Sequence, residues 1–546
     1  SIAWRRRYLS YNKRFFRDWK MILKNYLTKE QNEARKKIEE VAKECGLDFF
    51  KTHFFMLDFD QFNRVIANSG FPVRYNHWKF GMEYNQLNKQ LGHGFGRVYE
   101  LVINNNPAIA YVSDTIVPVH QRTIMAHVFA HVDFFKNNYA FKETNKNMIN
   151  VMANHANTIN KYIKTVGEEK VEKFIDACLS LENLIDSESV RIKRRHDKAC
   201  EEEDNCENDP NCASCQGCSS GCEEKDKKIS TGEEFRMKTK YPYMDDFINT
   251  PEFLESQRKK IQDEKPKKKT NPPEPERDVL LFILENSEKL TKWQKDVLSI
   301  IRDESYYFNP IGVTKIMNEG WASYWHDYMM TEKGLAEDDG IVEYAISNAG
   351  ILRTNKTRIN PYQLGIELFR DIKDRWDKGK HGNEYENEKN FQRRKKWNTQ
   401  EGKGLEKIFE VRKTRNDLEF IREFMTDDFI RERMLYTFKL DPKDEWYKIA
   451  NKDPAHVRNI FLNQLTNFGE PVIKVLDGNY RNGKELLLMH SFEGRILDVI
   501  KTRKTLENLF TLWGRTVYIH SKKSNGNPIL HAFNGLEHKT LEAKNK

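Results

Sequence analysis

The chain has 546 residues, of which 38% are hydrophobic and 12% aromatic, a composition that excludes wholesale disorder. Its formal net charge of +9 is mild for this length, and the basic residues are interleaved with acids, so we do not expect nucleic acid as a partner. No run approaches the roughly 18 apolar residues of a membrane span, and the basic N-terminus lacks the apolar segment of a secretory signal. We therefore expect a cytoplasmic protein without a membrane span.

The first part of the sequence alternates between helical and looser patterns. Residues 1–65 carry apolar side chains at helical spacing, which predicts an N-terminal helical segment. Residues 66–118 hold more turn residues, and the runs VYELVIN and AIAYV have the composition of short strands. Residues 119–196 return to three successive helical patterns. This part of the chain therefore predicts a helical body with a small amount of strand.

A polar insertion at about 197–277 interrupts the helical patterns. It combines few apolar residues with charge runs and adjacent prolines, which predicts an exposed loop. Helical patterns then resume, and the final segment has two strands around RNGK, a helix and a further strand. We therefore predict a mainly α fold with minor β, in which a helical core over 66–440 is followed by a small α+β module over 441–546.

The segment MAHVFAHVDFFKNN, residues 125–138, places two histidines in an apolar helical pattern. His127 and His131 lie four residues apart, so they share one helix face and can bind one ion. Neutral imidazole is a common zinc ligand, but two histidines leave a tetrahedral ion short of ligands. In zinc enzymes with the H-E-x-x-H motif, a glutamate after the first histidine activates water, and here Val128 holds that position.

Glu319, in the segment IMNEGWASYWH, is the best candidate for a third ligand. Small residues that permit close helix packing follow it, namely Gly320, Ala322 and Ser323. The run NEGWA also resembles a motif on the glutamate helix of some gluzincin metallopeptidases, where a glutamate completes a His2Glu site. His326, two turns further along, is a fourth ligand or a residue that orients a ligand. We expect a divalent transition metal, zinc first, on a zincin-like helix pair; a buried His–Glu hydrogen-bond network without metal is the rival interpretation.

The valine at position 128 leaves such a centre without its usual proton acceptor. Valine cannot take a proton, so a hydrolase of this type needs another carboxylate. Asp133 lies on the same helix but off the ligand face, and Glu182 and Glu304 lie on other helical patterns. These three are the candidate catalytic residues, although a structural role is the simpler interpretation of each taken singly.

Several long motifs together resemble the SpoVR family, the stage V sporulation protein R family. They include HWKFGMEY, VYELVINNNPAIAY, MAHVFAHVDFFKNN, DACLSLENLID and IMNEGWASYWHDYMM, and the resemblance spans roughly residues 60–520. It implies a bacterial or archaeal protein of the sporulation or stress programme, linked in spore formers to cortex peptidoglycan. The family's gene neighbours imply a serine protein kinase and a von Willebrand-type domain protein as partners. The ligand roles of the two histidines and Glu319 are inferred from the residues, not from the family.

The polar insertion departs from that family pattern because it carries a cysteine cluster. Its last four cysteines run C-x2-C-x2-C-x3-C, which resembles the ferredoxin spacing, although a glutamate follows where a proline is usual. A second zinc site, an unliganded redox or disulfide loop, and an iron–sulfur cluster all remain open. The residues concerned are Cys200, Cys206, Cys212, Cys215, Cys218 and Cys222.

Two functions fit these observations. The first is a metal-dependent hydrolase that cleaves an amide bond in a peptide or a peptidoglycan precursor, with a carboxylate from elsewhere moving protons. The second is a regulatory or scaffold protein whose metal site is structural or vestigial. A catalytic site keeps one coordination position open beside a pocket, whereas a structural site is closed.

Overall fold

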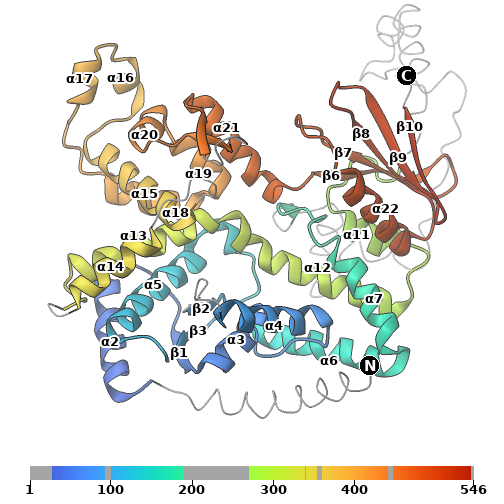
Figure 1. Ribbon diagram of the computed structural model, residues 1–546, viewed down its shortest axis with the longest axis horizontal. Helices are drawn as coiled ribbons and strands as arrows, with labels where there is room; N and C mark the ends of the chain where they lie inside the picture. The colour runs from blue at the N-terminus through green and yellow to red at the C-terminus, as the bar shows by residue number, and fades with distance from the viewer. Residues whose placement is uncertain are drawn as a thin grey trace, which may run out of the picture. The chain divides into compact units, whose positions relative to one another are not determined.

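A computed structural model describes residues 27–92, 100–189, 270–337, 340–352, 360–440 and 447–542 (Figure 1). The chain divides into two compact units: unit 1 comprises Ser1–Ile185 and Lys289–Val472, and unit 2 comprises Asp186–Glu288 and Ile473–Lys546. The secondary structure is mainly α with minor β, which confirms the predicted class at that level. Within the described residues, no helix is long and apolar enough to cross a membrane.

Unit 1 is built mostly from helices. Those that precede the insertion are α2 (Lys29–Glu44), α3 (Phe59–Ala67), α4 (Trp78–Gly92), α5 (Pro118–Asn137), α6 (Met148–Val166) and α7 (Glu168–Leu179), with the short 3-10 turn η1 (Tyr139–Phe141). Those that follow are α12 (Lys292–Val313), α13 (Lys315–Thr331), α14 (Ile341–Ile351), α15 (Pro361–Asp377), α16 (Gly382–Asn387), α17 (Phe391–Lys395), α18 (Gly404–Thr414), α19 (Asp417–Phe424), α20 (Asp427–Glu432), α21 (Pro454–Leu465) and η4 (Thr466–Gly469).

A three-stranded sheet lies among these helices. It contains β1 (Thr52–Leu57), β2 (Glu100–Ile103) and β3 (Ala108–Ser113) in the order β1-β3-β2. β1 runs parallel to β3, whereas β2 runs antiparallel to it and lies at an edge. The strands predicted from VYELVIN and AIAYV are β2 and β3. A separate antiparallel pair joins β4 (Thr437–Leu440) to β5 (Tyr447–Asn451).

Helices α5 and α13 form the centre of unit 1. Every residue from Met125 to Phe135 on α5 and from Ile316 to Ser323 on α13 is buried, because other elements cover these helices on all sides. α5 packs against α2, α13 and α18, and α13 packs against α15 (Figure 1). A helix enclosed in this way carries apolar residues around its whole circumference, so any polar side chain on it needs a specific partner.

The position of α13 is set by contacts at its start and along its back. The Asp417 carboxylate accepts hydrogen bonds from the backbone N–H groups of Ile316 (2.7 Å) and Met317 (2.8 Å), which otherwise have no partner in a first helical turn. Gly320 meets Gly365 of α15 backbone to backbone, since a Cβ at Gly320 would lie 2.4 Å from Gly365 Cα. Gly320 therefore permits the close helix packing that its small size predicts, and the helix that it meets is α15.

The described residues of unit 2 form a five-stranded sheet with two helices. Its strands β6 (Ile473–Tyr480), β7 (Glu485–His490), β8 (Val517–Lys522), β9 (Pro528–Phe533) and β10 (His538–Glu542) lie in the order β10-β9-β8-β7-β6. β7 and β8 are parallel and are joined through α22 (Val499–Trp513), which packs on β8 and β9, while α11 (Val279–Asn286) packs on β6. The predicted Asn-Gly hairpin connects β6 to β7, with Arg481 and Asn482 at φ of 57° and 56°.

Candidate metal centre

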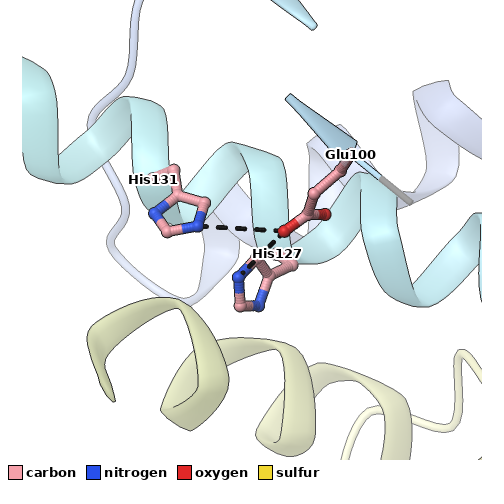
Figure 2. Close-up of side chains that lie close together, drawn as sticks. All are labelled: Glu100, His127 and His131. Carbon is pink, nitrogen blue, oxygen red and sulfur yellow. Dashed lines mark ion pairs between the residues drawn. The ribbon is translucent and has the colours of Figure 1, made fainter. Parts of the chain in front are cut away.

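The two histidines of α5 point to the same side of the helix. His127 and His131 lie one turn apart with ring centroids separated by 4.4 Å, and both are buried (Figure 2). This is the arrangement that the i, i+4 spacing predicts. Their Nε2 atoms face a common space between α5, α13 and the edge strand β2.

Glu319 of α13 reaches that space from the opposite side. Its Oε2 lies 3.5 Å from Nε2 of His127 and 3.5 Å from Nε2 of His131, and the side chain is buried. Its other oxygen, Oε1, accepts a hydrogen bond from Lys315 one turn earlier on the same helix. One oxygen of Glu319 therefore faces both histidines symmetrically, while the other is held by a cation.

A second carboxylate, which the sequence prediction missed, comes from the sheet. Glu100 opens β2, and its Oε1 lies 3.2 Å from His127 Nε2 and 3.9 Å from His131 Nε2 (Figure 2). The ligand atoms of Glu100, His127 and His131 all lie within 4.8 Å of one another. The sequence offers one sign of this role: an acidic residue directly precedes the apolar run Leu101–Ile103 in a predicted strand.

The spacing of these four side chains suits one ion. Ligand atoms held about 2.1 Å from a zinc ion at tetrahedral angles lie about 3.4 Å from one another. Three of the four nitrogen–oxygen separations, at 3.2, 3.5 and 3.5 Å, are close to that value. His127 Nε2, Glu319 Oε2 and Glu100 Oε2 are buried atoms without a hydrogen-bond partner, which is costly unless a cation lies between them. The donor set thus fits a divalent transition metal.

The outer nitrogens of the two imidazoles are already engaged. His131 Nδ1 lies 2.9 Å from the side-chain oxygen of Asn318, and because that oxygen only accepts, the proton belongs on Nδ1. His127 Nδ1 lies 2.8 Å from Nδ1 of His326. If His127 donates there, both Nε2 lone pairs face the centre, as metal binding requires. His326 consequently lies behind His127, in the position of a residue that orients a ligand.

Burial and neighbouring charges separate the two carboxylates. Burial raises the pKa of Glu100 to about 8, and the charge of Glu319 acts in the same direction. Burial also acts to raise the pKa of Glu319, but the adjacent imidazoles of His127 and His131 and the charge of Lys315 outweigh it and hold that pKa well below its usual range. Burial lowers the pKa of His127 to about 3, so its ring stays neutral. Without an ion the centre thus holds one ionised and one protonated carboxyl group.

The centre opens into a cavity of about 920 Å³ within unit 1. This volume is typical of small-molecule and cofactor sites. Polar groups gather at the centre, including Lys315, Asn318 and Tyr362, while most of the remaining lining is aliphatic or aromatic. Glu100 is the more accessible of the two carboxylates, since its side chain is 21% exposed against 7% for Glu319.

Asp133, a candidate catalytic residue, lies on α5 but serves the packing of helices. Its carboxylate accepts hydrogen bonds from Trp321 Nε1 (2.8 Å) and from the backbone N–H of Asp48 (2.8 Å), and it lies 3.6 Å from Arg412. It is fully buried and does not line the cavity. These contacts join α5, α13 and α18, so the geometry places Asp133 away from the reacting region.

Glu304 and Glu182, the other two catalytic candidates, belong to a second buried cluster. Glu304 of α12 pairs with Arg74 at 2.7 Å and lies 3.2 Å from His155 Nδ1, and it does not line the cavity. Glu182 follows the end of α7, and burial raises its pKa, with the Glu304 charge contributing in the same direction. The structure thus does not bring these two carboxylates to the metal centre. The six cysteines predicted to form a second site lie outside the described residues.

Two family models and a known protein match this chain. A family model described as SpoVR like protein matches residues 25–470, and a second, described as SpoVR-like C-terminal domain, matches residues 471–524. The protein YcgB of Escherichia coli (strain K12), whose printed description is "uncharacterized", is 26% identical over 514 residues, covering 90% of this chain and 91% of the relative. No solved structure matches the chain.

Proposed function

The chain belongs to the SpoVR family, and we propose that it is a metal-dependent hydrolase that cleaves amide bonds. The observation that supports this most directly is the convergence of His127, His131, Glu319 and Glu100 at the head of a cavity, with ligand atoms left unpartnered. Two histidines on one helix and a glutamate on a second helix support the proposal that α5 and α13 form a zincin-like helix pair, as predicted from NEGWA.

We assign His127, His131 and Glu319 as the residues that hold the ion. All three are at least nine-tenths buried, and each has a partner that fixes its orientation: His326, Asn318 and Lys315 respectively. Such partners tune ligand basicity and geometry. A divalent ion bound there would polarise a substrate carbonyl and acidify water.

Glu100 supplies the proton transfer that residue 128 cannot. Its Oε2 has no hydrogen-bond partner, and its side chain is partly open to the cavity, as a group that meets both water and substrate must be. In this role Glu100 takes a proton from the attacking water and returns it to the leaving amine. Tyr362, whose phenol lies beside Glu319, stays protonated because burial raises its pKa, and so it remains a hydrogen-bond donor at the centre.

Metal analysis of purified protein tests the ligand set. We expect about one zinc equivalent in the wild type and a loss of at least about tenfold in affinity in His127→Ala and Glu319→Gln. His120→Ala is the matched control, because His120 lies on the same helix and lines the same cavity but is not part of the ligand group. Equal metal content in all four proteins, or none in the wild type, would rule out the centre.

The scaffold function is the second candidate, and one observation favours it. The group of mutually close ligand atoms includes Glu100, and four protein ligands would close the coordination shell. The variant Glu100→Gln separates the two functions. A hydrolase keeps its metal and loses cleavage of amide substrates; a closed structural site loses metal. If the site is structural, the proposal to test is that the chain binds the protein kinase and the von Willebrand-type domain protein that family gene order suggests.

A further inference from the structure

The strand that carries Glu100 has an open edge. β2 is the last strand in the order β1-β3-β2 and pairs antiparallel with β3, from Glu100 opposite Val112 to Ile103 opposite Ile109. In the described part of the chain, no strand pairs with its other side. In an antiparallel ladder, every second residue directs its backbone N–H and C=O toward the partner strand, and the residues between direct theirs outward. β2 therefore presents backbone donors and acceptors on its outer side.

The cavity runs along this open edge. Alternate side chains of a strand point to opposite faces, and here Val102 packs with the apolar cluster around α5 and α13, whereas Leu101 and Ile103 pack with the cluster formed by α3, α6 and α12. All four residues of β2 nevertheless line the same cavity. Residues from both faces can border one space only if that space lies at the edge between the faces.

An edge of this kind recognises a specific chemistry. Outward N–H and C=O groups spaced along a strand match the backbone of an extended polypeptide, which adds to the sheet by main-chain hydrogen bonds. The apolar lining on either side, with Phe71 and Tyr307 next to one face and Ile116 and Ile124 next to the other, suits hydrophobic side chains of that segment. The strand begins at Glu100, beside the histidines.

Resting on the metal-dependent hydrolysis proposed above, we propose that the substrate is a segment of L-polypeptide that lies extended along β2 as a fourth strand. Its scissile carbonyl lies beside Glu100 and the histidine pair. Hydrolysis breaks the C–N bond: water contributes OH to the carbonyl carbon and a proton to the nitrogen, so the products are a carboxylate and an amine. A chain that contains D-residues, as peptidoglycan stem peptides do, cannot keep this ladder while placing its side chains on alternate faces.

Hydrogen exchange of the full-length, zinc-loaded protein tests this directly. The probe is a mixture of short capped L-peptides built from alanine, valine, leucine, phenylalanine and lysine, compared with a D-mixture in which every second residue is the D-enantiomer. We expect the L-mixture to slow exchange in the peptic fragment over residues 100–104 and the D-mixture to leave it unchanged. β10 is an internal control, because it is an edge strand of the other sheet that lines no part of this cavity.

A second measurement uses the tightest-binding L-sequence. N-methylation of every second amide of that peptide should weaken binding about tenfold, while methylation of the intervening amides should leave the affinity unchanged. The inference is overturned if residues 100–104 are not protected or if D-peptides protect them equally. It is also overturned if methylation of either set of amides weakens peptide binding to the same extent. If such a protein still cleaves amides, the hydrolase proposal stands and only the substrate class fails. If the protein binds no metal but L-peptides still protect residues 100–104, the strand-pairing proposal stands and the hydrolase proposal fails.

Discussion

Two buried clusters of carboxylates and histidines lie in unit 1, and they differ in how far their buried charge is compensated. In the cluster around Glu304, an arginine meets the carboxylate directly: Arg74 lies 2.7 Å from Glu304, and both side chains are only 5% exposed. At the metal centre, two carboxylates and two imidazoles converge, and the neighbouring cation, Lys315, contacts the outer oxygen of Glu319. Three atoms there, His127 Nε2, Glu319 Oε2 and Glu100 Oε2, are buried without a hydrogen-bond partner.

This difference separates a structural cluster from a candidate site. A buried carboxylate is costly unless an opposite charge and hydrogen bonds compensate it. Glu304 is compensated within the protein, so nothing further has to bind. The candidate metal centre lacks that compensation and opens into a cavity, as the proposed binding of a cation and a substrate requires. Sequence patterns alone suggested a catalytic role for Glu304, because they show neither the arginine nor the cavity.

Removal of Arg74 is expected to have the largest effect on stability among the tests of this comparison. We expect Arg74→Ala to lower the free energy of unfolding by about 3–5 kcal/mol, because it leaves Glu304 buried without its counter-charge. The double variant Arg74→Met with Glu304→Leu should recover most of that loss, since it removes both charges and keeps the volume. Urea unfolding of the three proteins measures this. A single variant as stable as the wild type would contradict the role given to Arg74.

Removal of metal has the next largest expected effect. An ion that binds only the folded state stabilises it by about 2.7 kcal/mol at a hundredfold excess over its Kd. A chelator should therefore lower the Tm of the wild type, and zinc should restore it. The double variant His127→Ala with Glu319→Gln should respond to neither, whereas Arg74→Met with Glu304→Leu should respond as the wild type does. An equal response of all three would place the ion elsewhere in the chain.

The smallest expected effect on stability comes from a further buried carboxylate, Asp417. Burial raises its pKa to about 7, although two backbone N–H groups oppose the shift. Because the folded state binds this proton more tightly than the unfolded state does, the stability it contributes is full below about pH 4 and is lost as the pH rises through about 7. Between pH 6 and pH 7 alone, we expect a loss of about 1 kcal/mol in the wild type and none in Asp417→Asn, with Tm measured across that interval. A Tm profile of the variant parallel to the wild type would contradict it.

The parts of the centre that the sequence predicts are those set by local geometry. His127 and His131 follow from helical spacing, and Glu319 from a motif on a second apolar helix. Glu100 could not be found in this way, because its place depends on how β2 pairs with β3 and on the approach of that sheet to α5. The same limit explains Gly320: its size predicts a close contact, but not that α15 makes it. The mainly α fold with minor β was predictable because periodicity alone determines it.

The position of Val128 has a consequence for how such centres are recognised and redesigned. Val128 is fully buried in the apolar cluster of unit 1, so a glutamate introduced there would enter the hydrophobic core as an unpaired charge. Introducing the glutamate of the H-E-x-x-H motif at this residue would therefore damage the protein rather than improve it. In the function proposed above, the acid–base group lies on a separate element, and a search pattern confined to one helix will overlook proteins organised in this way.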